Sequence, residues 1–308
     1  MLPKTDYKKI AITGATGFLG KYLVKHFISC GYDVLVLARE EEHPETCYDY
    51  PVNYVMTDYS VASLEAVLKD REVVVHLVGQ TLQRESNPLM VSQFFKVNVG
   101  ILENIVLAGR NTGLKAIYQM SSNNVYSSAN TMPWDESQIP VPSSVYGLSK
   151  QMAEALGAYI SSVTDIKVVS LRLARLFGYG ERDTVVFTKY MKLAIKKQQL
   201  EVWGTGSTSI EYLYVRDVVD AIETAVRTNV PAGAYNVGCG KSYSVLEIAE
   251  TINREAGNDG NLFIDNTKPE GNYHILMDSS KFKKATNWES KWTLENAVKE
   301  MISLYQNE

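Results

Sequence analysis

The sequence predicts an α/β fold: a doubly wound parallel sheet with helices on both faces, accompanied by a smaller α/β domain. Two observations favour this class. Short β-branched runs alternate with helical patterns along the chain, and a glycine-rich turn joins the first run to the first helical pattern. The expected strands of the main sheet are Lys9–Ile12, Asp33–Ala38, Asn53–Met56, Val73–Val78, Lys115–Met120, Lys167–Leu171 and Ala234–Val237.

The glycine-rich turn follows the first strand. Lys9–Ile12 leads into a turn that contains Gly14, Gly17 and Gly20, and then into a helical pattern over residues 21–29. The first glycine permits the tight turn, the second lets the backbone approach a pyrophosphate, and the third allows close packing of helix on strand. Unpaired N–H groups at the helix start are then available to phosphate oxygens. Strand, glycine turn and helix together predict a dinucleotide-binding site of the Rossmann type.

A hydroxyl and a Tyr-x-x-x-Lys pair lie between residues 122 and 150. Tyr146 and Lys150 are four residues apart, so on a helix they share one face. A free tyrosine titrates at about 10, which is too high for a base at neutral pH. Because a fixed ammonium favours the phenolate, we expect Lys150 to bring the pKa of Tyr146 into the range of a general base. Ser122 supplies the hydroxyl upstream of this pair.

These motifs, in this order, resemble the short-chain dehydrogenase/reductase superfamily. The chain length resembles its extended branch, the nucleotide-sugar epimerases and dehydratases. Further segments that resemble this branch are residues 73–79, 97–100, 120–126, 235–238 and 244–248. The resemblance implies catalysis by Ser122, Tyr146 and Lys150, with Asn98 steadying the active site.

The resemblance also implies a bound NAD. The residues that it places around the cofactor are Gly14, Thr16, Gly17, Phe18, Leu19, Arg39, Asp58, Tyr59, Leu77, Val78, Gly79, Asn98, Tyr146 and Lys150. Asp58 matches an acid that contacts adenine in the family, or is an ordinary turn residue. NAD-binding sheets usually carry an Asp or Glu about 20 residues after the glycines, to bind the ribose 2′-hydroxyl. Here Ala38 and Arg39 stand at the strand end, which leaves NADP as an alternative to NAD, unless Arg39 stacks on adenine or points to solvent beside Glu40–Glu42.

The neighbours of Ser122 bear on the reaction type. Dehydratases of the resembled branch have an acid–base pair of Asp and Glu there, whereas this chain has Asn123 and Asn124. Because an amide has no proton to exchange at neutral pH, elimination of water is disfavoured. The resemblance then implies a nucleotide-sugar 4-epimerase in which Tyr146 takes the proton of the 4-hydroxyl. An NADP-dependent reductase of a nucleotide-linked keto sugar is the alternative, and a non-catalytic dinucleotide-sensing module is a third.

The expected substrate is a UDP-linked hexose, bound by Ser122, Asn123, Tyr146, Arg175, Arg216, Lys268 and Ile275. Two family positions for the diphosphate differ here: Arg175 replaces an Asn, and Ile210 replaces an Arg. We therefore expect Arg175, together with Arg216, to carry part of the phosphate binding, unless Arg175 pairs with a local carboxylate. Lys268 occupies a position at which the resembled family has a further phosphate-binding Arg.

Ile275 matches a position that is tyrosine in family members restricted to UDP-glucose and UDP-galactose. A smaller residue leaves space for an N-acetyl group, so UDP-N-acetylglucosamine and UDP-N-acetylgalactosamine are expected substrates, together with or instead of the glucose pair. The alternative is that Ile275 is ordinary packing.

Composition sets further limits. The net charge of −4 argues against nucleic acid or an anionic membrane as main partner. The cysteines, Cys30, Cys47 and Cys239, are far apart, which predicts neither disulfides nor a metal site. With no signal-peptide pattern and no apolar run of about 18 residues, the sequence predicts a cytoplasmic protein. The resemblance implies a homodimer.

The expected domain organisation follows from these matches. Residues 1–172 form the dinucleotide-binding domain, and roughly 217–240 complete its sheet. Residues 173–216 and 241–308 form the substrate-binding domain, which closes over the carboxyl ends of the strands, where ligands of such sheets bind.

Overall fold

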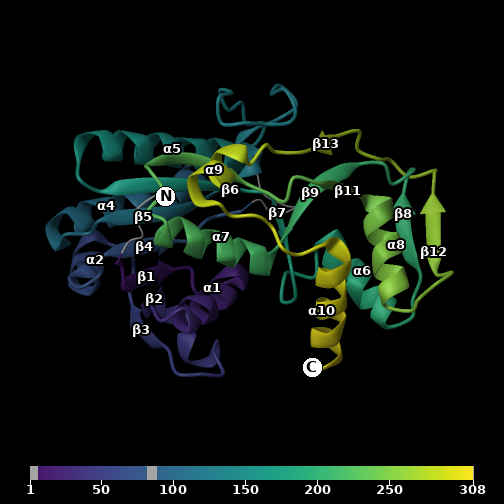
Figure 1. The fold of residues 1–308 in the computed structure, drawn as a ribbon, viewed down its shortest axis with the longest axis horizontal. Helices are drawn as coiled ribbons and strands as arrows, with labels where there is room; N and C mark the ends of the chain where they lie inside the picture. Colours follow the sequence, from purple (N-terminus) through teal and green to yellow (C-terminus); the bar gives the residue numbers. More distant parts are fainter. Residues whose placement is uncertain (1–5, 82–88, 308) are drawn as a thin grey trace.

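The computed structural model describes residues 6–81 and 89–307 (Figure 1). Its largest element is a seven-stranded sheet with the order β10-β6-β5-β4-β1-β2-β3, in which every neighbouring pair is parallel. Its strands are β1 (Lys9–Thr13), β2 (Asp33–Ala38), β3 (Asn53–Met56), β4 (Val73–His76), β5 (Ala116–Ser122), β6 (Lys167–Leu173) and β10 (Gly233–Val237). The predicted fold class is confirmed.

The strand bounds differ from the expected ones mainly at β4. This strand ends at His76, two residues before the predicted end. The Leu77 N–H donates to the Thr13 backbone oxygen at 3.2 Å, and the Thr13 hydroxyl accepts from the N–H groups of Leu77 and Val78, at 3.2 and 3.4 Å. Strands β5 and β6 extend two residues further than predicted, to Ser122 and Leu173.

Helices cover both faces of the sheet, which makes it doubly wound (Figure 1). One apolar cluster joins the sheet to α2 (Val61–Leu68), α4 (Gly100–Thr112) and α5 (Val145–Val163). The cluster on the opposite face joins it to α1 (Phe18–Ser29), α7 (Val215–Arg227) and α9 (Ser280–Thr286). The α3 helix (Val91–Asn98) precedes α4 and packs on α5.

The remaining elements form a smaller α/β assembly beside the sheet (Figure 1). Its β9 (Ser209–Tyr214) pairs with β7 (Arg175–Phe177), β11 (Ser242–Ser244) and β13 (His274–Ile275), while β8 (Leu200–Trp203) pairs with β12 (Leu262–Asp265). Around these strands lie α6 (Val186–Ile195), α8 (Val245–Glu255) and α10 (Leu294–Gln306), whose apolar residues share one core. Short 3-10 helices occur at Glu40–Glu42, Pro44–Thr46 and Asn123–Val125.

One stretch, Val91–Thr112, is long and apolar enough by composition to cross a membrane. Its α4 part, however, buries Leu102 and Ile105 completely in the core beneath the sheet. A core helix satisfies the same length and composition criteria, so this stretch is weak evidence for a membrane span.

Candidate active site

The first turn of α5 brings Tyr146 to the end of β5. The Ser144 hydroxyl caps the helix by accepting the Gly147 N–H at 3.1 Å. A Cβ on Gly147 would lie 2.0 Å from the backbone oxygen of Asn124, so only glycine lets the helix approach the segment after Ser122 this closely. The approach depends on residue 147, which lies inside the Tyr-x-x-x-Lys motif.

The Ser122 hydroxyl is held by its two asparagine neighbours. It donates to Oδ1 of Asn123 at 3.2 Å and accepts from the backbone N–H and Nδ2 of Asn124, at 3.1 and 3.0 Å. Ser122 and Asn123 are both buried. The two amides therefore orient the hydroxyl, and neither is a proton acid or base.

Lys150 lies one turn of α5 beyond Tyr146, as predicted for a shared face. Its Nζ donates to the backbone oxygen of Met120 at 2.8 Å and lies 6.0 Å from the centroid of the Tyr146 ring. Burial lowers the pKa of Lys150 to about 8, while the charge of Glu154 acts in the opposite direction. A Cβ on Gly79 would lie 3.0 Å from this Nζ, so the glycine leaves space for the lysine end.

The pKa of Tyr146 differs from the expected direction in this structure. Burial raises it, and the two influences that lower it are the hydrogen bond with Ser122 and the charge of Arg175. Burial wins because a phenolate loses more hydration energy than these neighbours return. Tyr146 is therefore a phenol at neutral pH in this state.

Asn98 connects three elements around Lys150. Its Nδ2 donates to the Ser149 hydroxyl at 2.8 Å and to the Gln80 backbone oxygen at 3.1 Å, and its Oδ1 accepts the Gln80 N–H at 2.7 Å. The side chain thus ties the end of α3 to α5 and to the segment after β4. His76 lies at the end of β4, where its Nδ1 is 2.8 Å from the Thr13 hydroxyl. Burial, with the charge of Lys150 adding to it, lowers the pKa of His76 to about 3, so the ring is neutral.

The glycine turn fits a dinucleotide phosphate. Gly14 has φ +66°, and a Cβ there would lie 2.9 Å from the N atom of Val78. A Cβ on Gly20 would lie 2.3 Å from the Gly14 oxygen, which is a forbidden distance. Helix α1 starts after Gly17 without a side-chain cap, so its first N–H groups are available to an anion. Thr16 is half-buried in this turn, and Phe18 and Leu19 open the helix.

The residues expected near adenosine lie at the ends of β2 and β3. Arg39 pairs with Glu41 and Glu42, each at 3.1 Å, and its side chain is 52% exposed. Asp58 is exposed and accepts the Ser60 N–H at 2.8 Å. Tyr59 is buried, with φ +60°, and its hydroxyl donates to the Leu37 oxygen at 2.9 Å. Two local carboxylates therefore compete with a 2′-phosphate for Arg39.

Arg175 stands at the start of β7 and acts on Tyr146 through its charge. Its Nη2 pairs with Oε1 of Glu181 at 2.6 Å, so the local carboxylate pair considered as the alternative is present. The arginine side chain is 36% exposed, whereas that of Glu181 is 9% exposed. The other carboxylate oxygen of Glu181 is buried without a hydrogen-bond partner among the described residues. Burial raises the pKa of Glu181, against the charge of Arg175.

The other expected substrate residues, Ile275, Arg216 and Lys268, contact different parts of the structure. Ile275 of β13 is the register partner of Ile210 of β9, so the expected sugar-pocket position adjoins the position of the missing arginine. Arg216 pairs with Glu300 of α10 at 2.7 Å. The ammonium of Lys268 lies 5.7 Å from the centroid of the Trp203 ring. Arg216 and Lys268 therefore have contacts outside the Tyr146 cluster.

Sequence reasoning missed three carboxylates near these positions. Glu154 and Glu181 contact the arginines Arg172 and Arg175. Glu270 accepts hydrogen bonds from Thr205 and Thr208 and so closes the turn that precedes β9. Of the three, only Glu154 could have been predicted from the sequence, because it follows Lys150 by one helical turn and so shares its helix face.

Comparison with known proteins places this geometry in a family. The model described as the NAD dependent epimerase/dehydratase family matches residues 10–238. The chain belongs to this family. The resemblance to the extended short-chain dehydrogenase/reductases is confirmed, and the protein is an enzyme of the epimerase/dehydratase type.

The family includes relatives with different reactions. The crystal structure of UDP-N-acetylglucosamine 4-epimerase from Bacillus cereus is 28% identical, with a TM-score of 0.87, and the match covers 98% of this chain and 97% of that one. A Methanocaldococcus jannaschii protein provisionally named UDP-glucose 4-epimerase is 28% identical over 308 residues, 97% of this chain and 98% of the relative. A dTDP-glucose 4,6-dehydratase of Streptomyces griseus is 27% identical over 263 residues, 81% of this chain and 79% of the relative.

The buried ammonium predicts an unusual pH dependence of stability. The pKa of Lys150 is about 8 when folded and 10.5 for a free lysine, so the folded state releases this proton first and stability rises between these two pH values. Below that window the buried charge costs roughly 3 kcal/mol, and its hydrogen bond offsets about 1 kcal/mol. Lys150→Met should therefore raise Tm at pH 7, by an amount that shrinks toward pH 10, measured by thermal unfolding.

Lys21→Met provides the matched control, because Lys21 is exposed on α1. It should leave the dependence of Tm on pH as in the wild type. A Lys150→Met protein that is less stable than the wild type at pH 7 would contradict the interpretation.

Proposed function

We propose that the protein is a nucleotide-sugar 4-epimerase that interconverts UDP-hexoses with bound NAD. The observation that carries the proposal is the cluster of Ser122, Tyr146 and Lys150 beside the glycine turn, with Asn123 and Asn124 around the serine. The two amides hold the Ser122 hydroxyl but cannot supply the acid and base for elimination of water. This favours epimerisation over dehydration.

The proposed chemistry uses each of these side chains at the sugar C4. Tyr146 takes the proton of the 4-hydroxyl, and Ser122 hydrogen-bonds the same oxygen. Lys150 and Arg175 provide positive charge near the Tyr146 phenol. This charge favours the phenolate once a substrate hydroxyl donates the hydrogen bond that water cannot supply in the buried site. A bound nicotinamide would accept the hydrogen of C4 as hydride and return it. Rotation of the 4-keto sugar between these events gives the epimer without net oxidation.

Residues of this chain would hold the dinucleotide. The first N–H groups of α1 would meet the pyrophosphate, the glycine turn would let the backbone approach it, and Lys150 would bind the nicotinamide ribose. NADP remains the alternative cofactor because the strand end carries Arg39 and no acid. NAD is favoured because Glu41 and Glu42 already neutralise Arg39. The reductase of a nucleotide-linked keto sugar is correspondingly the second candidate.

The proposal extends to assembly and location. The division into a cofactor domain and a substrate domain at about residue 172 is retained as part of it. Apolar side chains stand exposed on α4 and α5, namely Leu107, Met152, Tyr159 and Val163. These helices suit the contact of a homodimer, and we propose a cytoplasmic dimer.

The primary test is epimerisation without added cofactor. Purified protein is incubated with UDP-N-acetylglucosamine or UDP-glucose, and the configuration at C4 is followed by proton NMR. The galacto epimer should appear, and Tyr146→Phe should lower the rate about 10²- to 10⁴-fold because the general base is lost.

Tyr54→Phe is the control, since Tyr54 is exposed on the edge strand β3, away from the Tyr146 cluster and from the proposed dimer contact, and should retain full activity. Absence of conversion even with added NAD, together with oxidation of NADPH by a keto sugar, would transfer the assignment to the reductase.

A second prediction concerns the sugar pocket. Ile275→Tyr should reduce kcat/KM selectively for the acetylated sugars, because a bulkier side chain beside Ile210 fills the space for the N-acetyl group. The ratio of kcat/KM for UDP-N-acetylglucosamine and UDP-glucose is the measurement. Equal losses for both substrates would show that residue 275 acts through packing alone.

A third prediction concerns the diphosphate. If the substrate phosphate takes Arg175 from Glu181, Arg175→Gln should raise KM about 10-fold or more with a smaller change in kcat. Arg227→Gln is the control, because Arg227 forms a similar ion pair with Glu223 at the end of α7. A loss confined to kcat would mean that Arg175 serves Tyr146 and not the phosphate.

A further inference from the structure

The catalytic face of α5 extends one turn beyond the Tyr-x-x-x-Lys motif. Tyr146, Lys150 and Glu154 follow one another at four-residue steps along this helix. All three lie against the end of β5: Ser122 is near enough to Tyr146 to oppose the rise in its pKa caused by burial, Lys150 donates to the Met120 oxygen, and Glu154 accepts from the Ser121 hydroxyl. Glu154 therefore lies on the same face of α5 as Tyr146 and Lys150, and it places a carboxylate there.

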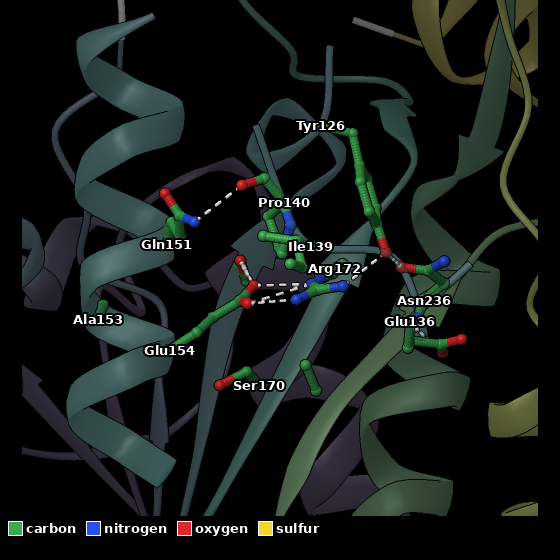
Figure 2. Close-up of polar contacts among 12 residues, drawn as sticks. Tyr126, Glu136, Ile139, Pro140, Gln151, Ala153, Glu154, Ser170, Arg172 and Asn236 are labelled. Carbon is green, nitrogen blue, oxygen red and sulfur yellow. Dashed lines mark hydrogen bonds and ion pairs between the residues drawn. The ribbon is translucent and has the colours of Figure 1, made fainter. Parts of the chain in front are cut away.

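The Glu154 carboxylate is fixed by Arg172 of β6 (Figure 2). The guanidinium donates to both carboxylate oxygens, with Nη2 to Oε2 at 2.7 Å and Nε to Oε1 at 3.0 Å. Both side chains are at least nine-tenths buried. A buried pair of this kind adds little stability relative to apolar residues of similar size. A contribution to stability therefore does not explain why Glu154 and Arg172 are buried beside Lys150.

The network continues away from the site (Figure 2). Arg172 donates to the Tyr126 hydroxyl at 2.5 Å, and this hydroxyl donates to Oδ1 of Asn236 at 3.1 Å. The Asn236 N–H in turn donates to Glu136 at 2.7 Å. Arg172 therefore has partners on both sides, and its geometry is fixed from β10 as well as from α5.

Among residues 6–81 and 89–307, the titratable groups that face Lys150 are the following. On α5 they are Tyr146 and Glu154, the latter paired with Arg172 of β6, and from β4 the neutral His76 lies near it. From β5 the contact is the Met120 backbone oxygen, and beyond β4 it is the side chain of Asn98, next to Gly79. Of these, Glu154 is the acidic side chain that opposes the effect of burial on Lys150.

We propose that Glu154 is a positioning residue for the catalytic group: held by Arg172, its carboxylate keeps the buried Lys150 in the ammonium form and fixes the end of β5 against α5. The catalytic role of Lys150 rests on the proposed function, whereas the effect of Glu154 on its charge does not. Without the carboxylate, the amine loses its proton, and with it the positive charge beside Tyr146, at a lower pH.

The test is a pH titration of Lys150 itself. Protein is prepared with ¹³Cε-labelled lysine, and the Lys150 resonance is assigned by its absence in Lys150→Met. In the wild type its midpoint is expected near pH 8. In Glu154→Gln the midpoint should fall by about one pH unit, the effect of removing one nearby opposite charge.

Glu136→Gln is the matched control, because Glu136 lies at the far end of the same network and should leave the midpoint unchanged. Glu154→Asp retains the charge and should restore most of the wild-type value. If Glu154→Gln fails to fold, the double variant Glu154→Leu/Arg172→Met is compared with Arg172→Met, which retains the carboxylate, and the double variant should have the lower midpoint.

An unchanged midpoint in a folded variant without the carboxylate would overturn the proposal, because the role of Glu154 would then be structural. The titration needs no substrate, so its result stands even if the epimerase assay fails. Where epimerisation is observed, the alkaline limb of the kcat profile should move with the Lys150 midpoint in each variant.

Discussion

The site depends on the contact between helix α5 and the end of strand β5. A helix repeats its face every three to four residues, whereas a strand advances about 3.3 Å per residue. Tyr146, Lys150 and Glu154 lie on one face of α5, and this face meets the end of β5: Lys150 donates to the Met120 oxygen and Glu154 accepts from the Ser121 hydroxyl. Gly147 makes the approach close enough, since a Cβ there would collide with the Asn124 backbone. The position of Tyr146 relative to Ser122 depends on this packing arrangement.

Burial has opposite consequences for the two titratable groups in this contact. It favours the neutral amine of Lys150 and the neutral phenol of Tyr146, so both groups resist the charged pair that base catalysis needs. The surrounding charges of Glu154 and Arg175 act against this effect, one on each residue. Arg175 is in turn paired with Glu181, and Glu154 with Arg172. Two ion pairs, formed by Arg172 of β6 and Arg175 of β7, thus lie near Lys150 and Tyr146.

The sequence predicted those parts of the protein whose signal is local. The glycine turn, the seven strands and the Tyr146–Lys150 pair are recognisable because each depends on spacing within a few residues. The partners of Arg39 and Arg175 were not assigned, because several acids lie near each arginine and side-chain geometry decides among them. Arg172 and Glu154 are 18 residues apart and look like ordinary charges in the sequence. The direction of the Tyr146 pKa was wrong for this state, because the sequence does not show how deeply a residue is buried.

The place of Asn236 in the polar network has a consequence for how the active site matures during synthesis. The strands that carry Thr13, His76 and Ser122 lie in the first half of the chain, but β10 forms the opposite edge of the sheet and pairs only with β6. Until residue 236 has been synthesised, the Tyr126 hydroxyl lacks one of its acceptors and Arg172 faces an open sheet edge. A nascent chain can therefore form its glycine turn early, while the surroundings of helix α5 are completed late.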